Sequence, residues 1–249
     1  MPIERCFILG VPVDNVNMAD ALRYAKDVIQ SNSRSAIIAV NPEKVMAAVK
    51  DPMLGACLHE AGLVLPDGVG VVLAARMRGS SMKGRVPGSE LMPLLCEMAA
   101  SSGYGVYLYG AAEEVNALAA AALKKKYPAL QIVGRQHGFL SSDVRNTLVE
   151  SINSSGAKIL FVALGSPRQE LWIRAHLGML NVNVVQGVGG TFDVIAGRVK
   201  RAPRAFIKLN LEWLYRLLAD PRRVARQKVL PIFTVKVILE AFSMARVKK

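Results

Sequence analysis

Five short runs of apolar and β-branched residues recur along the chain, each bounded by polar residues, glycine or proline. Runs of this length and composition predict strands that are buried in a sheet. They are SAIIAV (35–40), GVYLYG (105–110), LQIVG (130–134), AKILFVAL (157–164) and VNVVQGV (182–188). Continuous apolar strands are typical of parallel sheets, because helices cover both of their faces.

Segments with helical periodicity lie before and between these runs. They are MADALRYAKDVI, PEKVMAAV, AAEEVNALAAAALKKKY, SDVRNTLVESI and PRQELWIRAHLGML. Strands that alternate with helices predict an α/β fold, here a Rossmann-like, mostly parallel sheet with helices on both faces. Ligands of such folds bind at the carboxyl ends of the strands, so the residues that directly follow each strand are the candidates for chemistry.

The charge of the chain is concentrated near one end. Of the net +13, residues 198–249 carry +11 (14 basic and three acidic side chains), and the preceding 197 residues carry +2 (18 basic and 16 acidic). This shift predicts an α/β body at 1–197 and a basic, helical appendage at 198–249. A basic surface typically meets phosphate, in nucleic acid, in anionic lipid or in a phosphorylated substrate.

Cysteine usage and hydropathy indicate the compartment. The three cysteines are widely spaced and form no CxxC pair, which fits a reducing cytoplasm. The first residues show no charged leader followed by a long apolar run, so we expect no signal peptide. The apolar segment VLPIFTVKVILEAF is interrupted by Pro231 and Lys236, which favours lying on a membrane surface over crossing it.

Asn41 follows the first predicted strand, and Asp67 follows the short apolar run LVL (63–65). Asn41 precedes Pro42 and is placed to cap a helix, although a cap at a strand end also lies at the ligand edge. Asp67 stands in PDGVG, where it either caps the next helix or serves as a general base beside a bound hydroxyl. Arg85, in a loop of glycine and proline, is either solvated or an anion contact.

Two further loops suggest a phosphate ligand. LGSPRQE (164–170) and QGVGGTFD (186–193) both follow strands, and a glycine-rich turn after a strand exposes backbone N–H groups to a diphosphate. GVGG is not the dinucleotide fingerprint GxGxxG, so an NAD site is poorly supported. The histidines and acidic residues show no metal-ligand spacing, so we expect no metal and no cofactor. At a bound diphosphate, we expect cationic side chains to take the role of a metal ion.

Taken together, these stretches resemble the WecG/TagA/CpsF family of glycosyltransferases. The matching segments, in the family's order, are NPEKVM (41–46), PDGVGVV (66–72), GRVPGSEL (84–91), LGSPRQELWI (164–173), GVGGTFDVIAGRVKRAP (187–203) and LEWLYRLLADPRR (211–223). The resemblance implies an inverting, metal-independent enzyme. It would transfer N-acetylmannosamine or its uronic acid from a UDP-sugar to an undecaprenyl-diphosphate-linked amino sugar at the cytoplasmic membrane face. Another UDP-hexose remains an alternative donor.

The resemblance also implies roles for individual residues. The catalytic base falls on Asp67, with Asn41 and Arg85 beside it in the active site. The UDP-sugar contacts fall on Gln169 and Asp193. The diphosphate falls near the glycine loop, with Gly187, Gly189 and Gly190, and the uracil falls near Phe139. One departure is Ala39, where the family often has Thr, and it bears on sugar identity.

In this family the appendage is thought to dock on the membrane and close over the active site. The matching arginines are Arg216, Arg223 and Arg226, and a guanidinium suits a diphosphate because it donates two directed hydrogen bonds. We expect an anionic membrane surface as a partner and no nucleic acid. A nucleic-acid-binding protein and a nucleotide-dependent oxidoreductase remain alternatives from other classes, and the oligomeric state stays open, with a homo-oligomer possible.

Overall fold

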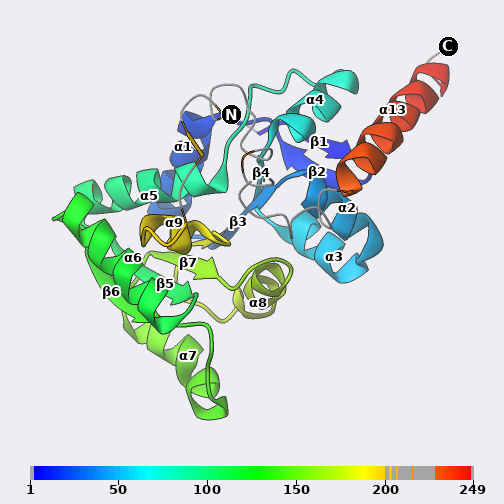
Figure 1. Cartoon of the computed structure of the whole chain (residues 1–249). Helices are drawn as coiled ribbons and strands as arrows, with labels where there is room; N and C mark the ends of the chain where they lie inside the picture. Colours follow the sequence, from blue (N-terminus) through cyan, green and yellow to red (C-terminus); the bar gives the residue numbers. More distant parts are fainter. Residues whose placement is uncertain (1–2, 200–201, 204–205, 207–214, 216–227, 248–249) are drawn as a thin grey trace.

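The computed structural model describes residues 3–199, 202–203, 206, 215 and 228–247. Its centre is a six-stranded sheet in the order β4-β3-β8-β7-β5-β6, in which every neighbouring pair is parallel (Figure 1). The strands are β3 (Ser35–Val40), β4 (Leu63–Pro66), β5 (Gly105–Gly110), β6 (Gln131–Gln136), β7 (Ile159–Ala163) and β8 (Val184–Gly187). The predicted parallel α/β sheet is thereby confirmed.

Alternation along the strands divides the core into two faces. In β3 the side chain of Ile37 packs into one core cluster and that of Ile38 into another, because successive residues of a strand point to opposite sides. The first face is covered by α1 (Met18–Gln30), α5 (Gly88–Ser102), α6 (Glu113–Lys126) and α9 (Thr191–Ile195). The opposite face is covered by α2 (Pro42–Lys50), α3 (Pro52–Glu60), α4 (Val69–Met77), α7 (Ser142–Ser154) and α8 (Arg168–His176).

In open α/β folds the ligand crevice lies at the carboxyl edge where the strand order reverses, which is here between β5 and β7. The connection from β5 leads outward to β6, whereas the connection from the adjacent β7 leads the other way to β8. Loops that leave neighbouring strands in opposite directions separate from each other, and ligands of open α/β sheets bind in the space between them.

An antiparallel hairpin, β1 (Arg5–Ile8) and β2 (Val11–Asp14), lies beside the sheet and was not predicted. Its two-residue turn is Leu9-Gly10, and both residues have positive φ, 50° and 79°. Such turns normally carry Asn or Asp with Gly, so Leu at the first position hides the hairpin from sequence patterns. The buried Asp14 accepts hydrogen bonds from Arg5 and from the Val64 amide of β4, which ties the hairpin to the sheet edge.

The last described helix, α13 (Val229–Val247), packs against α2 and α4 (Figure 1). Phe233 and Val237 are buried in the core cluster of that face. Both side chains belong to the segment VLPIFTVKVILEAF, which the sequence placed on a membrane surface, and for these two the structure differs because α13 turns them toward the body. No helix among the described residues is long and apolar enough to cross a membrane.

Candidate active site

The loops after β3 and β4 lie against each other at the carboxyl edge. The amide of Asp67 donates a 2.8 Å hydrogen bond to the carbonyl of Val40, so the pairing of the two strands continues into the loops. Gly68 has φ +117°, and a Cβ placed there would stand 3.8 Å from the Cβ of Asn41. The structure therefore places the loops that carry Asn41 and Asp67 side by side.

Local geometry separates the roles of these two residues. Asn41 is the N-cap of α2, where its Oδ1 accepts a 2.8 Å hydrogen bond from the amide of Lys44, so the cap interpretation is confirmed. The N-cap position of α4 belongs to Gly68 and not to Asp67. The cap role therefore does not explain Asp67, a half-buried carboxylate at the ligand edge of the sheet.

The loop that carries Arg85 joins the same edge. The amide of Val86 donates a 2.8 Å hydrogen bond to the carbonyl of Pro66, the last residue of β4. The side chain of Arg85 is mostly buried, and its Nη2 lies 3.7 Å from Oε1 of Glu90 on α5. The loop of Arg85 thus adjoins the end of β4, which Asp67 follows.

On the other side of β3, residues from α2, from α8 and from the loop after β8 form a buried polar network. Nζ of Lys44 lies 2.6 Å from Oε1 of Glu170, which also accepts a 2.9 Å hydrogen bond from Nε2 of Gln169. Oε1 of Gln169 accepts a 3.0 Å hydrogen bond from the amide of Gly189, in the loop after β8. Burial raises the pKa of Glu170, but the Lys44 ammonium and the hydrogen bonds outweigh it, so the pKa is lowered overall.

The glycine loop 187–190 fits closely around Gln169. A Cβ on Gly187 would stand 2.8 Å from Nε2 of Gln169, so only glycine leaves room for that amide. Gly189 has φ +52°, in the left-handed region that favours glycine. The carboxylate of Asp193 lies nearby, with Oδ2 3.7 Å from the Cβ position of Gly190.

The loop after β6 reaches toward the crevice from the far side. The amide of Gly138 donates a 2.8 Å hydrogen bond to the carbonyl of Ala111, which follows β5, and a Cβ on Gly138 would stand 2.9 Å from the side chain of Leu164, which follows β7. The neighbouring Phe139 is 76% exposed. An exposed aromatic ring at the crevice is suited to stack on a planar ligand.

Comparison with known proteins shows the family to which the chain belongs. The model of the WecG/TagA/CpsF family of glycosyltransferases matches residues 6–247. The chain belongs to this family. Its relatives include proteins of Staphylococcus aureus, from strain MRSA252 and strain NCTC 8325, named N-acetylglucosaminyldiphosphoundecaprenol N-acetyl-beta-D-mannosaminyltransferase. Each is 36% identical over 232 residues, 92% of this chain and 91% of the relative.

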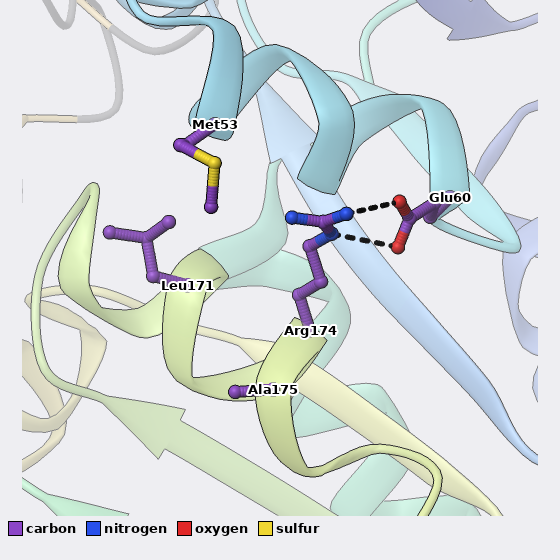
Figure 2. Close-up of a pocket in the computed structure, with 5 residues that line it drawn as sticks. All are labelled: Met53, Glu60, Leu171, Arg174 and Ala175. Carbon is purple, nitrogen blue, oxygen red and sulfur yellow. Dashed lines mark hydrogen bonds and ion pairs between the residues drawn. The ribbon is translucent and has the colours of Figure 1, made fainter.

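The glycosyltransferase also has a groove away from this edge (Figure 2). It measures about 280 Å³, lies between α3 and α8, and is lined by Met53, Glu60, Leu171, Arg174 and Ala175. Arg174 and Glu60 pair through two hydrogen bonds of 2.8 and 2.7 Å, which satisfies both charges. The groove contains none of the predicted site residues, so we do not assign it to the reaction.

Three further outcomes concern the appendage arginines, the metal and one ion pair. Arg216, Arg223 and Arg226 lie outside the residues that the structure describes. Within the described part of the glycosyltransferase, no three His, Cys, Asp or Glu side chains are grouped so that they could hold a metal ion. The Lys44–Glu170 pair was not predicted, because each residue reads locally as an ordinary helical position.

Proposed function

We propose that this glycosyltransferase moves an N-acetylmannosaminyl group, or its uronic acid, from a UDP-sugar to an undecaprenyl-diphosphate-linked amino sugar. The observation that carries the proposal is the 36% identity, over 92% of the chain, to a relative whose name specifies this transfer to N-acetylglucosaminyldiphosphoundecaprenol. The arrangement at the carboxyl edge of the sheet supports it, because Asn41 directly follows β3, Asp67 directly follows β4, and the glycine loop 187–190 lies at the end of β8.

Asp67 is the proposed base. Its carboxylate takes the proton of the acceptor hydroxyl while that oxygen forms a bond to the anomeric carbon of the donor. The bond from this carbon to the diphosphate oxygen breaks, and UDP leaves with the electron pair, so the configuration at the carbon is inverted. The contact of its loop with Asn41 supports the assignment, since both side chains then border one bound sugar.

The donor binds, in this proposal, between the loops after β8, β7 and β6. The glycine loop 187–190 takes the diphosphate, Gln169 and Asp193 flank the sugar side, and Phe139 stacks on the uracil. The charge that develops on the departing UDP is stabilised by Arg85 and by the appendage arginines Arg216, Arg223 and Arg226, without a metal ion.

The membrane side of the reaction is assigned to α13. Ile232, Val235, Leu239 and Phe242 are 50–68% exposed, and their spacing of three, four and three residues puts them on one stripe of the helix. At 100° per residue this stripe lies opposite the buried Phe233 and Val237. An apolar stripe on a helix near many cations suits the interface of an anionic bilayer.

A transfer assay tests the proposal. The purified full-length protein is incubated with a panel of UDP-sugars and a short-chain lipid-diphosphate N-acetylglucosamine acceptor, and the product is identified by mass and by its anomeric configuration. We expect one glycosidic bond to form with inversion and with UDP-N-acetylmannosamine or its uronic acid as the donor. Transfer only from another UDP-hexose, or no transfer at all, would overturn this specificity.

A further inference from the structure

We propose that Lys44 and Glu170 are positioning residues that fix the amide of Gln169 in one orientation and, through it, the glycine loop 187–190. The inference rests on the proposed function, in which that loop binds the donor diphosphate. Both residues lie in segments that match the family, NPEKVM and LGSPRQELWI, but the resemblance assigns no role to either of them.

Burial of the Lys44–Glu170 ion pair costs free energy, because both charged groups are removed from water. Glu170 is fully buried and the Lys44 side chain is 12% exposed, so both charges have lost most of their water. A buried ion pair is often no more stabilising than well-packed apolar residues of similar volume. Lys44 comes from α2, which follows β3, and Glu170 from α8, which follows β7, so the pair reaches across the end of β8 between them. Its position indicates a role at that strand end.

The chemistry of the contacts allows Gln169 only one orientation. A carboxylate accepts hydrogen bonds and a backbone N–H donates them. The amide nitrogen of Gln169 must therefore face Glu170, at 2.9 Å, and its oxygen must face the Gly189 amide, at 3.0 Å. With a neutral side chain at position 170 that offers its own N–H or O–H, this contact would no longer require the amide nitrogen, and only the Gly189 amide would favour the present orientation.

The glycine loop rests directly on this amide. Gly187 leaves only 2.8 Å between a would-be Cβ and the Gln169 nitrogen, and Gly189 both donates to the Gln169 oxygen and adopts φ +52°. Gln169 itself is 3% exposed. Its influence on the donor is therefore expected to pass through the backbone of the loop that it holds.

A cavity borders Glu170. It measures about 190 Å³, lies between α3 and α8, and is lined by Glu170 and by Cys57, Glu60 and Arg174. Among the described residues, these three and Lys44 of α2 are titratable or charged side chains that border Glu170 or its cavity. Oε2 of Glu170 has no hydrogen-bond partner among the described residues. Lys44 keeps the pKa of Glu170 low, so without Lys44 the effect of burial should dominate and raise it.

Three variants test the inference: Glu170→Gln, Lys44→Met and the double variant. UDP affinity is measured by calorimetry between pH 5 and pH 8, and amide hydrogen exchange is followed at 187–190. We expect Glu170→Gln to weaken UDP binding about tenfold, the effect of one lost charge-assisted hydrogen bond, and to speed exchange at Gly189. With Lys44→Met, affinity should fall, relative to the wild type and to Glu170→Gln, as the pH drops through the raised pKa of Glu170.

Glu60→Gln is the matched control, because it removes a carboxylate from the same cavity without touching Gln169, and it should leave UDP affinity unchanged. If Glu170→Gln melts like the wild type yet keeps its UDP affinity and its Gly189 protection, the inference is wrong. If Glu170→Gln does not fold, the double variant, in which neither position 44 nor position 170 is charged, gives the same comparison. Failure of the wild type itself to bind UDP would instead overturn the proposed function, since the exchange measurement needs no ligand.

Discussion

Glu240 of α13 lies 2.5 Å from Nη1 of Arg78, the residue that ends α4. The same carboxylate accepts a 3.2 Å hydrogen bond from the amide of Leu9 in the turn between β1 and β2. One side chain thus joins the carboxyl-terminal helix to both α4 and the amino-terminal hairpin. Together with the buried Phe233 and Val237, it fixes which side of α13 faces outward.

Glu240→Ala should loosen α13. The side chains of the pair are 15% and 26% exposed, so we expect a loss of about 1–2 kcal/mol in the free energy of unfolding. Chemical denaturation measures the loss, and hydrogen exchange over 229–240 should report faster opening there. Glu97→Ala, at an exposed position of α5, is the control. An unchanged exchange rate in α13 would mean that the apolar contacts alone hold the helix.

Asp67→Asn should remove the base and keep the site. We expect the fold and UDP binding to persist while kcat drops about 10²–10⁴-fold, as is typical for a lost general base. Single-turnover transfer kinetics and UDP calorimetry separate the two properties. Turnover near the wild-type rate in this variant would rule out Asp67 as the base.

The exposed stripe of α13 should carry membrane affinity. Leu239→Glu with Phe242→Glu should abolish binding to liposomes of anionic lipid, while transfer to a short-chain, water-soluble acceptor continues. Thr234→Glu adds one negative charge, where the double variant adds two, at an exposed position away from the stripe, and should retain most of the binding. Analytical ultracentrifugation tests the opposing interpretation. If the wild type is a dimer and the double variant is a monomer, the stripe is an interface with a second copy of the chain.

Lysine substitutions should separate two roles of the appendage arginines. Arg216→Lys, Arg223→Lys and Arg226→Lys keep the positive charge and lose the two-pronged donor, so liposome binding should persist while turnover falls. Flotation with liposomes and transfer kinetics on the same triple variant provide the comparison. If it transfers sugar at the full rate, these arginines only attract the membrane.

Transfer should not depend on a divalent cation. The proposed site stabilises the departing UDP with arginines, so activity in excess EDTA should match that in buffer. A loss of activity that magnesium or manganese restores would show that a cation takes part.

Several features could be predicted because they depend on local sequence. The parallel strands follow from apolar runs such as AKILFVAL, and the cap at Asn41 follows from the proline after it. The Lys44–Glu170 pair could not, because 126 positions separate its members and only the order of β3, β8 and β7 brings them together. The outward face of α13 was equally hidden, since both sides of that helix are apolar and its contacts with α2 and α4 decide which is buried.

The carboxylate of Glu240 and the amide of Leu9 are 231 positions apart, nearly the full length of the polypeptide. During synthesis the hairpin is made long before α13, so the apolar surface of α2 and α4 stays uncovered until α13 has left the ribosome. Long-range contacts of this kind slow folding and leave apolar surface exposed to chaperones. The nascent protein should therefore become resistant to protease only once the segment that we assign to the membrane has emerged.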